Sequence, residues 1–185
     1  MKVMAKMPAN LKATALPRHV NIDINVSDER WRAAIDTRVI SSVAINAAVK
    51  TTGLLIDGDC EISILFCNDE MMAGINKQWR SLDKPTNVLA FPAAEFPGQV
   101  FSRPSGDIAI ALETCQGEAL EAGIVFENHV VHLIIHGLLH LLGYDHETDE
   151  DAEEMESLET DILASIGIAN PYSDTLPGEE GGRID

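Results

Sequence analysis

Aromatic side chains are scarce in this sequence, which has two Trp, two Tyr and five Phe among its 185 residues. A protein that stacks successive nucleobases on an aromatic platform needs more of them, so this class of binder is disfavoured. Long hydrophobic runs are lacking too. The longest uncharged stretch, 128–144, contains histidines and glycines, which place it in a protein interior rather than in a membrane.

Cysteine is also rare. The three cysteines, Cys60, Cys67 and Cys115, are an odd number without a C-x-x-C pair, which argues against a disulfide framework and against a cysteine zinc site. We therefore expect reduced thiols and a cytoplasmic protein. The basic segment 1–19 lacks the unbroken apolar run of a signal peptide, and we expect it to be a flexible N-terminal extension.

Acidic residues outnumber basic ones, 30 to 13, which gives a formal net charge of −17. The excess is uneven, because residues 147–185 contain 13 acidic residues against one basic residue, whereas 1–20 contain four basic residues and no acidic one. The bulk charge disfavours a polyanionic partner, although a local basic cluster can still dominate a cleft. We assign 20–167 to one domain and 168–185 to an acidic, glycine-rich tail.

Hydrophobic periodicity predicts that strands and helices alternate along the domain. Residues 127–142 are apolar on nearly all sides, so this helix belongs in the centre of the protein. Asn68 and Thr148 are suitable N-caps for the helices that follow them. The order predicts an α+β fold, a single compact domain with a small mixed β-sheet and a central buried helix. The other predicted elements are strands at 20–26, 60–67, 86–91 and 106–112, one helix from Ser27 through Val43, and helices at 69–79, 113–122 and 149–166.

The central helix carries the residues on which a chemical function can be built. Four residues turn an α-helix by about 400°, so His136 and His140 project from the same side, about 6 Å apart along the axis. His146 can join them only if the helix ends first. Gly143 can adopt the left-handed conformation that ends a helix and reverses the chain. The spacing H-x-x-x-H-x-x-G-x-x-H therefore predicts three nitrogen ligands for one metal ion.

Three neutral ligands with an open fourth position are typical of catalytic zinc sites. We therefore expect one Zn²⁺ per chain. The alternative, three core histidines satisfied by hydrogen bonds, requires a partner for each buried imidazole. The metzincin protease motif H-E-x-x-H-x-x-G-x-x-H shares the histidines and the glycine. Here Gly137 stands in place of the glutamate that acts as general base, which argues against proteolysis.

The segment His136–His146 closely resembles the signature of the YbeY family of bacterial rRNA-maturation endoribonucleases. Trp79–Pro92 resembles the family's arginine loop and following strand, and Gly106–Ile108 resembles its short strand motif. The resemblance spans about 20–167. It implies a metal-dependent hydrolase that cuts single-stranded RNA during small-subunit rRNA processing and ribosome quality control. The implied partners are rRNA, the small ribosomal subunit and assembly factors, and we expect no membrane or DNA partner.

The resemblance also identifies Arg80 as the family's important arginine. Attack on a phosphodiester builds negative charge on phosphoryl oxygens, which a guanidinium stabilises through two hydrogen bonds. We therefore predict catalytic roles for Arg80 and His136, and substrate binding by Lys77 and Lys84.

Three further residues are candidates for contacts that orient a ligand or the substrate: Asp145, His132 and Asp107. The two aspartates can equally cap turns, His132 can be an ordinary partly buried histidine, and His129 is expected at the surface. Two other functions stay open. One is a zinc hydrolase with another substrate, such as a peptide, and the other is a non-catalytic ribosome-assembly factor with a vestigial metal site.

Overall fold

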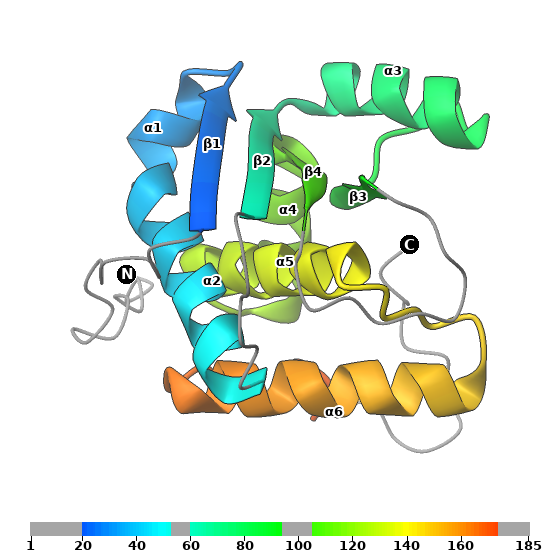
Figure 1. The fold of residues 1–185 in the computed structure, drawn as a ribbon. Helices are drawn as coiled ribbons and strands as arrows, with labels where there is room; N and C mark the ends of the chain where they lie inside the picture. Colours follow the sequence, from blue (N-terminus) through cyan, green and yellow to red (C-terminus); the bar gives the residue numbers. More distant parts are fainter. Residues whose placement is uncertain (1–19, 53–59, 94–104, 174–185) are drawn as a thin grey trace.

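The computed structural model describes residues 20–52, 60–93 and 105–173, so the expected extension 1–19 and most of the expected tail lie outside the described residues. Figure 1 shows the arrangement of the helices and strands in these ranges. In chain order they are β1 (Val20–Val26), α1 (Arg30–Ala34), α2 (Thr37–Thr52), β2 (Cys60–Cys67), α3 (Asp69–Arg80), β3 (Val88–Pro92), β4 (Gly106–Ala111), α4 (Leu112–Ala122), α5 (Phe126–Leu141) and α6 (Asp149–Ser165).

The strands of the described ranges form one four-stranded sheet in the order β1-β2-β4-β3. β1 pairs with β2, and β2 with β4, in parallel, whereas β3 lies antiparallel to β4 at the edge. The predicted small mixed sheet is therefore confirmed. β3 packs against α5, which brings this edge strand next to the histidine helix.

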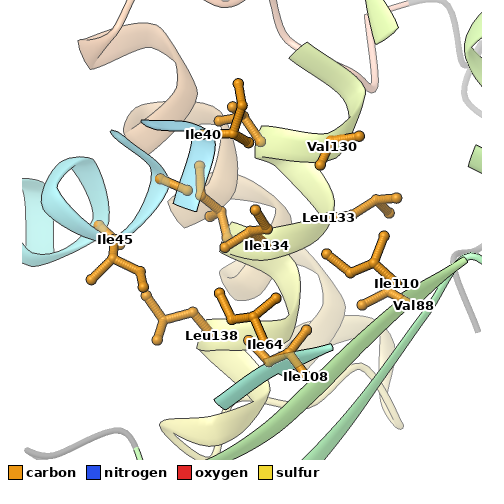
Figure 2. Packing of buried hydrophobic residues seen from close by; sticks show 14 of the residues in the cluster. Ile40, Ile45, Ile64, Val88, Ile108, Ile110, Val130, Leu133, Ile134 and Leu138 are labelled. Atoms are coloured by element: carbon orange, nitrogen blue, oxygen red, sulfur yellow. The ribbon is translucent and has the colours of Figure 1, made fainter. Parts of the chain in front are cut away.

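The core is built around α5, which lies between the sheet and α6 (Figure 1). Its side chains meet the sheet on one side and α2 on the other, and the residues that make these contacts are all buried (Figure 2). This arrangement explains why α5 is apolar on nearly every face, and it confirms the predicted central buried helix. The labelled side chains are Ile64, Val88, Ile108 and Ile110 from the sheet, Val130, Leu133, Ile134 and Leu138 from α5, and Ile40 and Ile45 from α2.

The prediction of one helix from Ser27 through Val43 was wrong, because the chain breaks between α1 and α2. Ile35 is extended, with φ −146°, and the Asp36 carboxylate then accepts hydrogen bonds from the backbone N–H groups of Arg38 and Val39. Asp36 thus starts a second helix, a competition between side chain and backbone that an apolar pattern does not reveal.

The packed structure also continues past residue 167, where the sequence placed the start of a tail. Ile168 is buried against the core, and the hydroxyl of Tyr172 reaches a buried carboxylate of α6. Across the described ranges, no single helix is both long and apolar enough to cross a membrane. α4 and α5 meet that criterion only as a pair, and they are bent by 117° relative to each other.

Candidate metal centre

The three histidines of the motif come together at the C-terminal end of α5. One ring nitrogen from each of His136, His140 and His146 lies within 4.8 Å of the others. His136 and His140 stand one turn apart on the helix, with their Nε2 atoms 3.1 Å apart, and His146 approaches from the turn that follows. The spacing argument from the sequence therefore places these side chains correctly.

The turn that returns His146 to the helix is a Schellman motif. The N–H of Gly143 donates to the carbonyl of His140, and the N–H of Tyr144 donates to that of Leu139, at 2.9 and 3.1 Å. Gly143 has φ +89°, the left-handed region that side chains with a Cβ rarely adopt. The predicted role of Gly143 in reversing the chain is confirmed.

Hydrogen bonds fix the orientation of two of the three imidazoles. His140 donates from Nδ1 to the Tyr144 carbonyl, which cannot donate in return, so Nε2 keeps its lone pair. His136 Nδ1 lies 2.7 Å from Oε1 of Glu159, and an ionised carboxylate requires the proton to be on Nδ1. Both Nε2 lone pairs therefore face the space between the rings.

Glu159 is completely buried in α6, where its carboxylate accepts from three groups. Oε1 faces His136, and Oε2 accepts from His132 Nε2 at 3.0 Å and from the Tyr172 hydroxyl. Burial alone would raise the pKa of Glu159, but the hydrogen bonds from His132 and His136 hold the pKa well below its ordinary value. Burial and the neighbouring Glu159 raise the pKa of Tyr172, so the phenol keeps its proton and donates.

The electrostatics favour a neutral imidazole at His140. Burial, together with the neighbouring His136 and His146, lowers the pKa of His140 to about 4. His140 is therefore uncharged at neutral pH, the state in which an imidazole nitrogen can bind a cation.

This donor set fits a zinc ion. Two nitrogens that bind one tetrahedral zinc at about 2.0–2.1 Å lie about 3.3 Å from each other. The 3.1 Å between the Nε2 atoms of His136 and His140 is close to this value. Two lone pairs held at this distance repel each other unless a proton or a cation lies between them, and three neutral nitrogens suit zinc.

Arg80 reaches the same place from a distant part of the sequence. It is the last residue of α3 and lines a narrow pocket with His136, His140 and the edge-strand residues Val88 and Ala90. The free volume of the pocket, about 10 Å³, is roughly that of one water molecule. After Arg80 the chain turns through Ser81, at φ 60°, and Asn76 donates to the carbonyl of Lys84, which ties down the loop.

The other basic candidates lie near Arg80 but outside this pocket lining. The exposed Lys77 forms an ion pair with Asp83 at 2.6 Å. Lys84 is exposed in the loop that Asn76 anchors. Trp79, next to Arg80, is 66% exposed, and its ring packs at a tilt against Phe91, with the centroids 5.5 Å apart. The end of α3 and the following loop thus present cations and one exposed aromatic ring, and of these residues Arg80 is the one that lines the pocket with the histidines.

The remaining candidates divide into those near the centre and those away from it. His132 is buried one turn before His136 and shares Glu159 with it. Asp145 accepts from the backbone N–H of His146 at 2.7 Å and so supports the turn. Asp107 is exposed in β4 and, by strand alternation, faces away from Ile108, which packs on α5.

The expectation that His129 is a surface residue was wrong, because it is buried and its Nε2 is hydrogen-bonded to Glu118 at 2.7 Å.

Gly137, the residue that replaces the protease glutamate, packs closely against the sheet. A Cβ at this position would lie 3.0 Å from Cγ2 of Ile108, and Ile108 is itself buried in β4. A side chain at this position would require Ile108 to move by a few tenths of an ångström. The close packing is therefore a physical reason for a small residue at the position where the protease has its general base.

Sequence reasoning missed Glu159 and Tyr172. A usable signal existed for Glu159, because it interrupts the apolar stripe of α6, and a charged residue on a buried stripe needs a partner. The stripe consists of Ala152, Met155, Ile162 and Leu163. Tyr172 carried no comparable signal, since it follows the last helix in a segment without periodicity.

An α+β domain in which three histidines and an arginine converge beside an edge strand defines a class of small proteins with a three-histidine centre. The sequence profile of the family described as Endoribonuclease YbeY matches residues 23–167. A relative named Endoribonuclease YbeY from Methylocella silvestris is 46% identical over 162 residues, which cover 87% of this chain and 90% of the relative. A second, from Azorhizobium caulinodans, is 44% identical over 160 residues, which cover 86% and 99%. The chain therefore belongs to the endoribonuclease YbeY family.

A solved structure agrees with the fold. The solution structure of TM1509 from Thermotoga maritima matches with a TM-score of 0.53 and 24% sequence identity, over 86% of this chain and 99% of that one. At this identity the likeness supports the α+β architecture and nothing finer. The family resemblance and the fold class expected from the sequence are both confirmed.

Proposed function

We propose that this protein is a cytoplasmic, zinc-dependent endoribonuclease that cuts single-stranded RNA and acts in small-subunit rRNA maturation and ribosome quality control. The observation that carries the proposal is the pocket in which Arg80 faces His136 and His140, in a chain of the YbeY family. Metal-dependent nuclease chemistry needs a site for a cation and a group that stabilises phosphoryl charge, and this pocket offers candidates for both.

The proposed roles follow from the geometry of the residues. When bound by His136, His140 and His146, zinc supplies a Lewis acid and makes water acidic enough to attack at neutral pH. Arg80 donates to the phosphoryl oxygens on which charge accumulates, and its planar guanidinium suits two of them at once. Val88, Ala90 and Gly137 form the apolar wall that restricts the pocket to little more than one water.

The surroundings of Arg80 favour a single-stranded substrate. The exposed face of Trp79 can stack on one unpaired base, whereas the bases of a duplex are stacked on each other. Arg80 at the end of α3 and Lys84 in the following loop add positive charge. The charge of Lys77 is partly neutralised by its ion pair with Asp83. One aromatic face does not form a platform for successive bases, in agreement with the low aromatic content.

Two alternatives compete with this proposal. In the metzincin pattern a peptide substrate would need a general base at the position of Gly137, and glycine supplies none. A non-catalytic assembly factor would need RNA or ribosome contacts but no functional arginine in the pocket. Neither alternative accounts for Arg80 beside the histidines.

The test is cleavage of a labelled, unstructured RNA and of its duplex by the purified protein, by the chelated protein, and after one equivalent of zinc is returned. We expect cleavage of the single strand, loss on chelation and recovery with zinc. His140→Gln should abolish zinc retention and cleavage, whereas the matched control His129→Gln, on the same helix but outside the cluster, should retain both. Cleavage that survives chelation contradicts zinc dependence. Hydrolysis of casein without RNA cleavage favours the peptidase, and co-sedimentation with the small subunit without cleavage favours the assembly factor.

A further inference from the structure

We propose that Glu159, supported by Tyr172, is the positioning residue of the metal centre, because it fixes the ring of His136 so that Nε2 points at the bound zinc. The inference rests on the proposed metal site and adds to it a carboxylate from α6 and a hydroxyl from the segment beyond α6. It predicts that the affinity for zinc depends on two residues that do not touch the ion.

The first argument is the number of groups that hold this carboxylate. Oε1 accepts from His136 Nδ1 at 2.7 Å, and Oε2 accepts from His132 Nε2 at 3.0 Å and from the Tyr172 hydroxyl. Because both oxygens are engaged, the carboxylate cannot rotate without breaking at least one bond. The ring of His136 is consequently held in one tautomer and in one plane.

The second argument is the cost of placing a carboxylate here. Glu159 has no exposed surface, and it occupies a position where its helix otherwise buries Met155, Ile162 and Leu163. An apolar residue of similar size at such a position is often neutral or stabilising compared with a buried ionised group. Stability alone therefore does not explain the carboxylate, whereas the orientation of a metal-binding histidine does.

The third argument is a comparison within the same helix. His129 forms a similar pair with Glu118, at 2.7 Å, and Glu118 also accepts from the side chain of Asn87. His129 is not one of the three clustered histidines. Among the described residues, histidines of α5 therefore pair with two carboxylates, Glu118 and Glu159, and Glu159 is the one that reaches a histidine of the candidate metal site. This provides a control of matched chemistry.

The experiment measures zinc affinity by competition with a chromophoric chelator at pH 7.5, without RNA. Glu159→Gln keeps the size of the side chain but replaces one acceptor by a donor, and it should weaken zinc binding by about 10- to 100-fold. Tyr172→Phe removes only the hydroxyl that supports Oε2, and it should weaken binding several-fold. Glu118→Gln should leave the affinity within about twofold of the wild type.

A second readout separates orientation from stability. Long-range ¹H–¹⁵N spectra of the metal-free protein report which ring nitrogen of His136 carries the proton. We expect Nδ1 in the wild type and in Glu118→Gln, and a mixture of tautomers in Glu159→Gln. If Glu159→Gln fails to fold, Tyr172→Phe decides the matter in both measurements.

The outcomes are distinct. Wild-type zinc affinity and tautomer in Glu159→Gln, or in Tyr172→Phe where that variant decides, overturn the positioning role. An equal loss of affinity in Glu118→Gln also overturns it, because the effect would then come from packing around α5. A wild-type protein that binds no zinc overturns the metal site itself, and so the proposed function.

Discussion

Gly137 allows a sharp test of how closely α5 packs on the sheet. In most helix interiors, Gly→Ala stabilises a protein by up to about 1 kcal/mol, because glycine has the greater conformational entropy to lose. At Gly137 the new Cβ would lie 3.0, 3.2 and 3.3 Å from three carbon atoms of Ile108. Ile108 is 1% exposed, so it has little space into which to move.

We expect Gly137→Ala to destabilise the protein. Overpacking of a buried contact costs about 1–3 kcal/mol, which exceeds the gain in helix propensity and leaves a net loss of up to about 2 kcal/mol. Gly74 in α3 and Gly117 in α4 are matched controls, since a Cβ at either position meets no atom within 4 Å. Gly74→Ala and Gly117→Ala should each stabilise the protein by up to about 1 kcal/mol.

The assay is urea denaturation of the metal-free proteins, so that zinc affinity does not enter the free energy of unfolding. A double-mutant cycle with Ile108→Ala isolates the contact, because Gly137→Ala should lose most of its cost once the isoleucine side chain is removed. If Gly137→Ala stabilises the protein as much as Gly74→Ala does, the packing argument is refuted, and with it the physical explanation for the missing glutamate.

Three further predictions concern the turn, the arginine and pH. Gly143→Val should weaken zinc binding more than tenfold although residue 143 is not itself a ligand, because a β-branched residue is strained at φ +89°; equilibrium dialysis with wild-type affinity would contradict this. Arg80→Ala should lower RNA cleavage by about 10²-fold or more with unchanged zinc content, and Arg80→Lys should recover part of it; undiminished cleavage removes Arg80 from the site. Because the pKa of His140 is about 4 when folded and 6.5 when unfolded, the unfolded state binds more protons between these pH values, so the stability of the protein decreases as the pH is lowered through this range. Metal-free protein should lose roughly 2 kcal/mol between pH 7.5 and 5 by denaturant titration, and equal stability at the two pH values would exclude the shift.

The sequence predicted the parts of the centre that depend on local geometry. His136 and His140 are related by one helical turn, and the position of His146 requires only a helix end at Gly143, so spacing was sufficient. Arg80 was identified through the family resemblance, because nothing local connects it to residues more than 50 positions later. Glu159 was not found, since its role appears only when α6 packs on α5 and brings the carboxylate to His136.

The same division holds for the fold. Hydrophobic periodicity located β2, α3 and α6, and capping residues marked where the two helices begin. The side chains of the N-caps Asn68 and Thr148 accept hydrogen bonds from the backbone N–H groups of Met71 and Asp151. The break between α1 and α2 was missed because its cause, a side chain that competes for backbone N–H groups, interrupts no apolar pattern. Local rules predict elements whose ends are marked by composition, and they fail where a single polar contact decides.

The histidines of the centre stand on parts of the protein with different local stability. His136 and His140 belong to a core helix, whose amide groups exchange with solvent only when much of the protein unfolds. His146 lies beyond the helix end, in a turn flanked by the exposed residues Asp145 and Glu147, which can open at a small fraction of that free energy. The ring of His140 depends on both parts, because its Nδ1 is held by the Tyr144 carbonyl within that turn. Opening of residues 143–148 would remove His146 and release the ring of His140 while the core stays folded, so we expect a bound ion to exchange faster than the protein unfolds.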